Sequence, residues 1–271
     1  MHEQSQRFDL THTSTEVRAR GEGPTVLMIQ GLGTDQRAWE PVTAVMAGSV
    51  RCLTFDNRGV GTAGTAHHDL TFDALAEDVA ELIEAIGEGP LHIAGVSMGG
   101  GIAMRVAARH PDLVRTVSLH STTARPDARL LSVLDFREAV VASGQAATLL
   151  RPLVGLFAWG PAHQDVGMPT GVTEVGSIDI EQYRAHLNAA RTQWMTDEEL
   201  ATITAPTLIT VGDEDILTTP GMSRELAKAI PGSKLVIVGG GGHGYYLEES
   251  ALLGALQMGW ILQHEHAALV H

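Results

Sequence analysis

Residues 91–101 constrain the fold of this chain more than any other segment. Residues 91–94, Leu-His-Ile-Ala, form a short apolar run typical of a buried strand, and residues 98–109 follow with a helical pattern that ends before a proline. Between the two lies Gly-Val-Ser-Met-Gly at residues 95–99. A serine at a sharp turn from strand to helix needs small neighbours two positions away on either side, because strand and helix crowd together there. The segment therefore predicts a turn that exposes the hydroxyl of Ser97 at one edge of a sheet.

The helix predicted after Ser97 favours negative charge beside that hydroxyl. The first N–H groups of a helix have no partner within it, and the positive end of the helix dipole lies there. We expect the backbone N–H of Met98 to point at the oxyanion that forms when Ser97 attacks a carbonyl group. Ser97 is therefore the candidate nucleophile.

Short apolar runs alternate with helical patterns along most of the chain. The runs, each of which predicts a strand, cover residues 25–29, 50–55, 91–94, 114–119, 206–211 and 234–238. The helical patterns cover residues 72–86, 98–109, 221–230 and 249–263. Alternation of this kind is typical of βαβ units, so we expect an α/β fold with a mostly parallel central sheet and helices on both of its faces.

The alternation stops between residues 122 and 202. This stretch contains helical patterns at 130–141, 146–154 and 178–192, a loop rich in glycine and proline at 160–176, and no convincing parallel strand. We therefore expect one core made of residues 1–121 and 203–271, with residues 122–202 inserted between two halves of its sheet. A length of 271 residues suits one domain that carries a large insertion.

The candidate base is a histidine, because a serine hydroxyl is a weak nucleophile until a base takes its proton. The chain has 13 histidines, of which His243 is the best placed. It follows the strand predicted at 234–238 and a run of four glycines, which puts it on a loop at the carboxyl edge of the sheet, where Ser97 also lies. His120 ends the strand predicted at 114–119, at the same edge, and is the alternative.

The candidate acid is a carboxylate that orients the base and stabilises its protonated form. Asp213, Glu214 and Asp215 follow the strand predicted at 206–211. We choose Asp215 and keep Asp213 as the alternative, because a side chain two residues away could turn to the same place. Glu214 is expected to be solvated.

The chain resembles the α/β-hydrolase family of serine hydrolases over nearly its whole length. The resemblance rests on the order Ser97, Asp215, His243, on the nucleophile motif at 95–99 and on four further motifs. These motifs are Gln-Gly-Leu-Gly at 30–33, Asp-Asn-Arg-Gly-Val-Gly at 56–61, the strand and turn at 206–215, and Gly-His at 242–243 with Glu248 five residues on. The resemblance implies the α/β-hydrolase fold, in which residues 122–202 form a helical cap, inserted after the sixth strand, over the pocket. It also implies an oxyanion hole made by the backbone N–H groups of Leu32 and Met98.

Gln30 departs from this pattern. The family usually has histidine at this place, but that histidine is not the base, so the predicted catalytic residues are unaffected. Residues 31–39 are similar to the same region of 3-oxoadipate enol-lactonases, which also lack the histidine. Gln30 could support its loop or present its amide to the pocket, and with Gly31 and Trp159 it is a candidate for contact with the substrate.

These residues predict a serine hydrolase that cleaves a carboxylic ester or a lactone through an acyl-enzyme on Ser97. The cap is rich in leucine and aromatic residues, so we expect a small, largely hydrophobic substrate. Acyl transfer, hydrolysis of an amide or of a carbon–carbon bond, and non-hydrolytic chemistry on the same scaffold stay open. A receptor-like protein that binds a ligand without turnover is a further alternative.

Composition narrows the choice of partners. The formal net charge of −14 repels polyanions, so we expect a small-molecule substrate and neither a nucleic acid nor a membrane as partner. The chain has one cysteine, Cys52, and its first residues lack the apolar run of a secretory signal, which favours a cytoplasmic protein. We expect no metal or other cofactor, and both a monomer and a homodimer fit the sequence.

Overall fold

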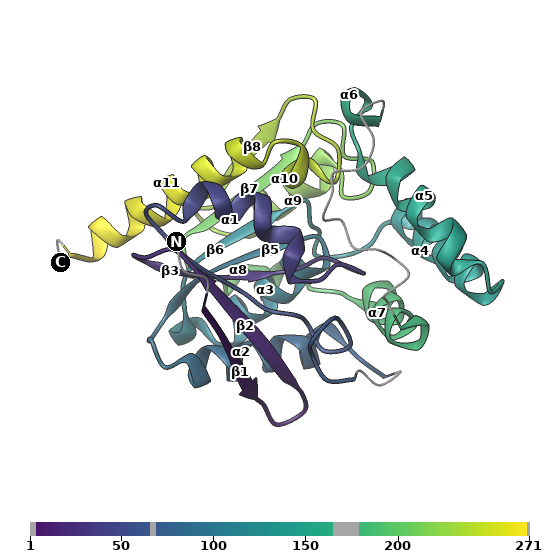
Figure 1. Ribbon diagram of the computed structural model, residues 1–271. Helices are drawn as coiled ribbons and strands as arrows, with labels where there is room; N and C mark the ends of the chain where they lie inside the picture. The colour runs from purple at the N-terminus through teal and green to yellow at the C-terminus, as the bar shows by residue number, and fades with distance from the viewer. Residues whose placement is uncertain (1–3, 66–68, 165–178, 270–271) are drawn as a thin grey trace.

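The central sheet has eight strands in the order β1-β2-β4-β3-β5-β6-β7-β8 (Figure 1). The computed structural model describes residues 4–65, 69–164 and 179–269. The first two strands, β1 (Gln4–Asp9) and β2 (Ser14–Arg20), form a hairpin that pairs antiparallel with β4. The other six run parallel to one another: β3 (Thr25–Ile29), β4 (Arg51–Thr54), β5 (Leu91–Val96), β6 (Val114–His120), β7 (Thr207–Gly212) and β8 (Lys234–Val238). The prediction of a mostly parallel sheet is confirmed.

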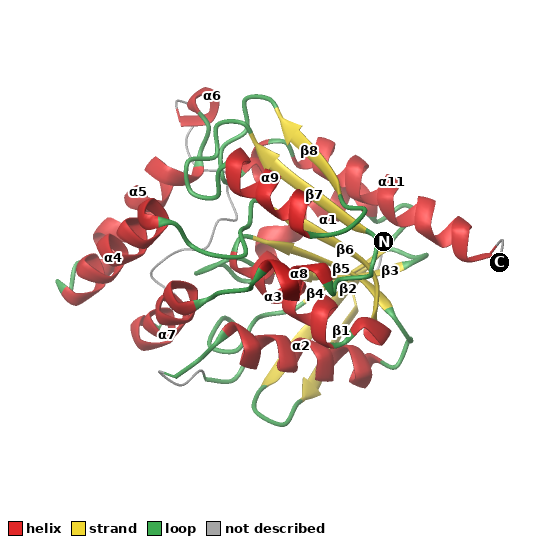
Figure 2. Ribbon diagram, turned by 180° about the vertical axis from the view of Figure 1, so that it is seen from behind, coloured by secondary structure: helices red, strands yellow, loops and turns green. Residues whose placement is uncertain are grey.

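Helices cover both faces of the sheet (Figures 1 and 2). One face carries α1 (Glu40–Met46), α10 (Tyr245–Glu248) and α11 (Ser250–Leu269). The other carries α2 (Phe72–Ile86), α3 (Met98–Arg109), α8 (Asp197–Ala201) and α9 (Pro220–Ala229). Two short 3-10 helices, η1 (Gln36–Trp39) and η2 (Pro111–Leu113), precede α1 and β6.

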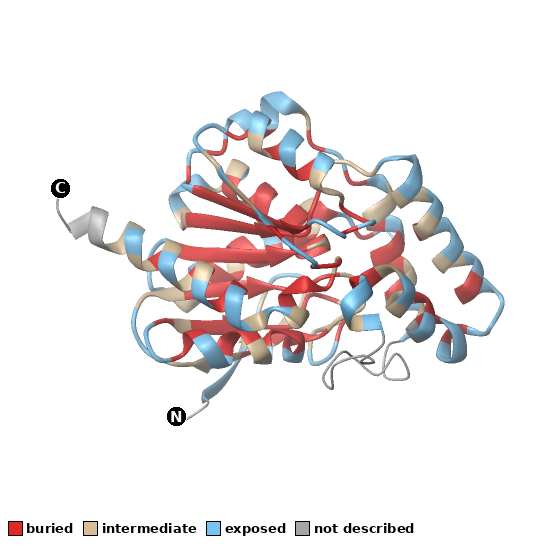
Figure 3. Cartoon of the chain, turned by 90° about the horizontal axis from the view of Figure 1, so that it is seen from above, coloured by how far each residue is buried: buried red, intermediate tan, exposed pale blue. Residues whose placement is uncertain are grey.

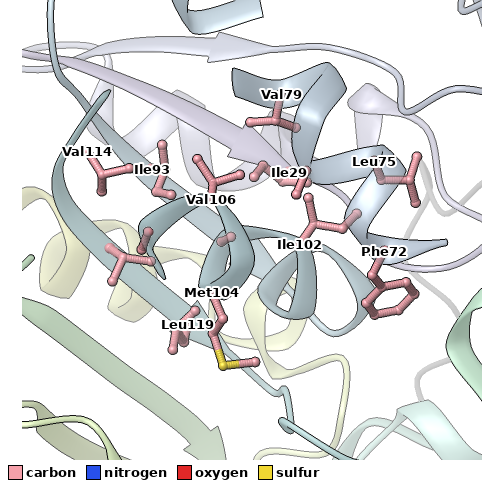
Figure 4. Packing of buried hydrophobic residues seen from close by; sticks show 14 of the residues in the cluster. Ile29, Phe72, Leu75, Val79, Ile93, Ile102, Met104, Val106, Val114 and Leu119 are labelled. Atoms are coloured by element: carbon pink, nitrogen blue, oxygen red, sulfur yellow. The ribbon is translucent and has the colours of Figure 1, made fainter. Parts of the chain in front are cut away.

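Successive side chains of the inner strands enter two different cores, as the period of two along a strand requires. In β3, Ile29 packs on the side of α2 and α3, whereas its neighbour Met28 packs on the side of α1 and α11. Figure 4 shows Ile29 close to Ile102 of α3, with Leu75 of α2 in the same cluster. Since helices cover both faces, the inner strands are buried along nearly their whole length (Figure 3).

The regular elements in the described part of the chain between β6 and β7 are all helices. They are α4 (Ala128–Ala142), α5 (Ala146–Ala158), α6 (Pro161–Gln164), α7 (Ile180–Thr192) and α8. In both views α4, α5 and α7 lie together beyond one end of the sheet, around an apolar cluster of their own that includes Leu134, Leu150 and Leu187 (Figures 1 and 2). The boundaries of the cap at residues 122 and 202 stay a prediction.

Several elements differ from the sequence-based expectation. The loop predicted at 160–176 is wrong for Pro161–Gln164, which form α6, and the rest of that loop lies outside the described residues. The sequence patterns also miss β1, β2, α1, α8 and α10. Most of β1 is exposed, so no alternation of apolar and polar residues marks it, and the three helices are too short to display a helical period.

Candidate active site

Ser97 lies at the tight turn between β5 and α3 that its sequence predicts. Its backbone has φ 54° and ψ −116°, a conformation that residues other than glycine seldom adopt. A Cβ atom on Gly95 would lie 2.2 Å from the carbonyl oxygen of Gly99, and a Cβ atom on Gly99 would lie 2.2 Å from that of Ile29. Only glycine fits at these two positions, so the flanking glycines of the motif make the strained turn possible.

The imidazole of His243 joins Ser97 to Asp215. Its Nε2 atom lies 3.0 Å from Oγ of Ser97, and its Nδ1 atom lies 2.9 Å from Oδ2 of Asp215. Because an ionised carboxylate can only accept, these distances assign the proton to Nδ1 and leave Nε2 to accept the proton of the serine hydroxyl. The structure thus brings together the three residues predicted as nucleophile, base and acid.

The carboxylate of Asp215 is fully buried and held on both oxygens. Its Oδ1 accepts from the backbone N–H groups of Leu217 at 2.9 Å and Thr218 at 2.8 Å, and its Oδ2 accepts from the Thr218 hydroxyl at 2.8 Å. Burial raises the pKa of this carboxyl, but the charge of His243 and the hydrogen bonds from His243 and Thr218 outweigh it, so the net pKa lies below its ordinary value. Asp215 is therefore an anion beside the imidazole.

The two alternative residues lie elsewhere. Asp213 is exposed and its Oδ1 accepts from the backbone N–H of Gly240 at 2.7 Å. His120 is completely buried, its Nδ1 lies 2.6 Å from the Thr210 hydroxyl, and burial lowers its pKa to about 4. Neither side chain bonds to Ser97 or to His243 in the described part of the chain, although the carbonyl of His120 accepts from the Ser97 N–H at 2.9 Å.

Glu248 ties the loop that carries His243 to the cap. Its side chain is completely buried. One carboxylate oxygen accepts from the backbone N–H of Gly242 at 2.9 Å, and the other accepts from the backbone N–H of Gly160, between α5 and α6, at 2.7 Å. Glu248 was part of the predicted motif, but its link to the cap becomes visible only in three dimensions.

The predicted oxyanion loop lies against the nucleophile. A Cβ atom on Gly31 would lie 3.4 Å from Cβ of Ser97, and the Thr34 hydroxyl closes the turn by donating to the Gly31 carbonyl at 3.0 Å. Leu32 and Met98, whose N–H groups are the predicted oxyanion donors, both line the pocket. Met98 is also the first residue of α3, where an N–H group has no partner within the helix.

The pocket above Ser97 is a mostly apolar cavity of about 130 Å³ between the sheet and the cap. Gly31 and Trp159 line it, as predicted for contact with the substrate. The prediction for Gln30 is wrong, because its side chain is completely buried, and it is not among the residues that line the cavity. Its carbonyl accepts from the side-chain amide of Asn57 at 3.3 Å, and Gly99 packs against the same carbonyl. Gln30 therefore lies behind the oxyanion loop.

The comparison with known protein families agrees with this geometry. The family model for the alpha/beta hydrolase fold matches residues 24–250. The chain belongs to this family. This α/β hydrolase is therefore an enzyme with the predicted fold.

Its relatives carry the names of several different activities. A putative carbamate hydrolase RutD of Caulobacter sp. (strain K31) is 28% identical over 225 residues, which cover 82% of this chain and 84% of the relative. A putative non-heme bromoperoxidase BpoC of Mycobacterium tuberculosis H37Rv is 30% identical over 250 residues, which cover 87% of this chain and 93% of that relative. The crystal structure of the enol-lactonase from Burkholderia xenovorans LB400 superposes with a TM-score of 0.85 at 24% identity over 95% of this chain and 100% of that one. At that identity the likeness shows the fold alone.

Within residues 4–65, 69–164 and 179–269, no helix has the length and apolar character needed to span a bilayer. Over the same residues no three histidine, cysteine, aspartate or glutamate side chains are grouped as metal ligands would be.

Thr218 is a site residue that sequence reasoning misses. It donates to Asp215, and its hydroxyl lies 3.1 Å from Nδ1 of His243. A threonine three residues after a carboxylate has no distinct signature until the path of the loop is known. Thr122 is missed for the same reason, and its hydroxyl donates to the Ser97 carbonyl at 2.7 Å.

Proposed function

We propose that this α/β hydrolase hydrolyses a carboxylic ester or a lactone of a small, largely apolar substrate through an acyl-enzyme on Ser97. The observation that carries the proposal is the chain of hydrogen bonds from Ser97 through His243 to Asp215. Ser97, at one end of this chain of hydrogen bonds, lines a cavity whose wall is mostly apolar. Such an arrangement activates a hydroxyl for attack on a carbonyl carbon.

In the first half-reaction, Oγ of Ser97 forms a bond to the carbonyl carbon while its proton passes to Nε2 of His243. The carbonyl oxygen becomes an oxyanion that the N–H groups of Leu32 and Met98 stabilise. Asp215 stabilises the imidazolium through its bond to Nδ1. When the carbon–oxygen bond to the leaving group breaks, His243 returns the proton to that oxygen, which leaves an alcohol and the acyl-enzyme.

In the second half-reaction, a water molecule replaces the alcohol. His243 takes a proton from the water as its oxygen bonds to the acyl carbon, and a second tetrahedral intermediate forms at the same oxyanion site. The bond to Oγ then breaks, the proton returns to Ser97, and the carboxylic acid leaves. If an alcohol takes the place of water, the same steps transfer the acyl group, so acyl transfer is the alternative within this mechanism.

The proposal is tested with a series of p-nitrophenyl esters and lactones, assayed on the wild type and on Ser97→Ala. Because one RutD relative is named a carbamate hydrolase, a carbamate belongs in the panel. We expect turnover of at least one ester or lactone and a loss of about 10⁴-fold or more in kcat for Ser97→Ala. Activity that persists in the variant contradicts the assignment of the nucleophile. Preferential product formation with an added alcohol, rather than water, would support the transferase.

A further inference from the structure

The wall of the active-site cavity contains one guanidinium group. Most of the lining side chains are apolar, but Arg137 of α4 also lines the cavity. No aspartate or glutamate in the described part of the chain is among the lining residues. An α/β hydrolase with a formal net charge of −14 thus presents a cationic cap residue to its substrate.

The neighbouring cap arginines are paired with carboxylates. Arg184 of α7 lies 3.1 Å from a carboxylate oxygen of Glu138, and Arg191 of α7 forms an ion pair with Asp135. Both carboxylates belong to α4 and lie close to Arg137 in the sequence. The two nearest acids on its own helix are therefore already engaged by α7.

Arg137 instead contacts a neutral phenol. Its Nε donates to the Tyr183 hydroxyl at 2.7 Å, and its guanidinium carbon lies 5.4 Å from the centre of the Tyr183 ring. Burial raises the pKa of Tyr183, so this hydroxyl carries no negative charge near neutral pH. The contact fixes the orientation of the guanidinium without neutralising it. Among the described residues, no carboxylate forms an ion pair with Arg137.

The hydroxyl donors in the cavity wall are already used. The four lining threonines each donate to an oxygen of the protein; they are Thr34, Thr122, Thr123 and Thr218. The guanidinium of Arg137 donates through Nε to the Tyr183 hydroxyl, which leaves its terminal N–H groups for the acceptor atoms of a ligand.

We propose that the substrate carries a carboxylate besides its ester or lactone group, and that Arg137 binds this carboxylate while the carbonyl carbon faces Ser97. The proposal rests on the proposed function and names its substrate class. A guanidinium binds a carboxylate through two parallel N–H···O bonds, and one such group balances one negative charge. Arg137 is then the residue that determines specificity for an ester or lactone that carries a carboxylate.

The test compares two esters of similar length, mono-p-nitrophenyl glutarate and p-nitrophenyl valerate, which differ in a terminal carboxylate. We expect the wild type to prefer the glutarate ester in kcat/KM. Arg137→Met should lower kcat/KM for the glutarate ester by about 10- to 100-fold, the worth of one charge-assisted interaction, and leave the valerate ester within about threefold. Arg184→Met, a cap arginine that does not line the cavity, is the matched control and should leave the ratio of the two esters unchanged.

Arg137→Lys separates recognition of charge from support of the cap. A lysine keeps the positive charge but loses the fork geometry, so it should restore part of the preference for the glutarate ester. If Arg137→Met and Arg137→Lys lower the activity on both esters equally, or if the wild type does not prefer the anionic ester, Arg137 is only a structural residue and the proposal is wrong.

A binding experiment on a variant without the Ser97 hydroxyl tests the anion site independently of the proposed function. Calorimetric titration of Ser97→Ala with glutarate should show binding that Ser97→Ala combined with Arg137→Met loses by about 10-fold or more. If no ester of any kind is hydrolysed by the wild type while this difference is observed, the proposed function fails and the anion site stands. Equal binding of glutarate by both proteins, or none by either, overturns the anion site whatever the hydrolysis assays give.

Discussion

The proposed chemistry depends on the strained backbone conformation of Ser97. Its left-handed φ of 54° persists because Gly95 and Gly99 let strand, helix and the end of β3 approach more closely than any Cβ atom allows. The structure therefore predicts that these two glycines, which carry no side-chain chemistry, are required for the turn that exposes the Ser97 hydroxyl.

Gly99→Ala is expected to reduce activity and stability together. Its new methyl group would lie 2.2 Å from the Ile29 carbonyl oxygen, which forces the oxyanion loop or α3 to move. Thermal unfolding and ester hydrolysis measure the two effects, with an expected loss of about 1–3 kcal/mol in the free energy of unfolding. Gly259→Ala is the matched control. It lies on the exposed side of α11 with nothing within 4 Å of the new methyl group, so it should be neutral or slightly stabilising. Wild-type behaviour of Gly99→Ala would contradict the packing argument.

The acid is tested by a matched pair of substitutions. Asp215→Asn removes the anion that accepts from Nδ1 of His243, so we expect kcat to fall by roughly 10⁴-fold, as for other triads of this type. Asp213→Asn changes an exposed carboxylate that accepts only from a backbone N–H of the loop, so kcat should stay within a few-fold of the wild type. A large loss confined to Asp213→Asn would reverse the assignment.

The residues of the candidate site could be predicted from the sequence to different extents. Ser97, His243 and Asp215 could be predicted because each follows a recognisable strand at one edge of the sheet, and the order of the three is informative. Gln30 was misplaced because its sequence position beside the oxyanion loop does not say on which side of the loop the side chain packs. Arg137 lies on α4 and could not be singled out, since the pairing of its neighbours with α7 depends on the packing of the cap.

At the scale of elements, the loop that carries His243 is held by a contact with the cap. Glu248 accepts from Gly242 on this loop and from Gly160 at the end of α5, so one buried carboxylate positions both segments. The base and part of the cavity wall therefore share an anchor, and we expect their positions to change together.

Glu248→Gln should weaken this anchor. The amide replaces one acceptor oxygen with an NH₂ group that faces a backbone N–H, which leaves a buried donor unpaired at a cost of about 1–3 kcal/mol. We expect a lower melting temperature and a lower kcat/KM on the preferred ester. The adjacent Glu249→Gln alters an exposed side chain and serves as the control. If the two variants behave alike, Glu248 does not position the base.

The predicted elements of the core are mostly those of the structure, because the buried parallel strands appear as short continuous apolar runs and the amphipathic helices show a helical period. Helices α2 and α3 have the predicted bounds. The hairpin of β1 and β2 is missed because β1 is exposed at the edge of the sheet and because Thr15 and Val17 are the only buried side chains of β2. Its place in the sheet is set by pairing with β4, which is far away in the sequence.

At the scale of the whole molecule, the folded chain buries several histidines of the sheet and the cap in the neutral form. Burial lowers the pKa of His120 to about 4, and also lowers the pKa values of His92 and His186. An unfolded histidine has its ordinary pKa of about 6.5, so between pH 6.5 and 4 the unfolded chain binds protons that the native state excludes. Stability should therefore fall as the pH falls through this window.

Denaturant unfolding at a series of pH values measures this effect. For His120 alone the loss across the window is on the order of 3 kcal/mol. His120→Asn is expected to be less stable at pH 7, because its bond to Thr210 is changed, but its stability should depend less steeply on pH between 6.5 and 4. An unchanged slope in the variant would show that His120 is not the group that titrates on unfolding.

A covalent label tests whether Ser97 is the nucleophile. The protein is treated with a fluorophosphonate, its intact mass is measured, and the modified peptide is mapped. We expect a single adduct on Ser97, formed fast in the wild type, slowly in Asp215→Asn and not at all in Ser97→Ala. An adduct on another residue, or none on a wild type that hydrolyses esters, would contradict this assignment.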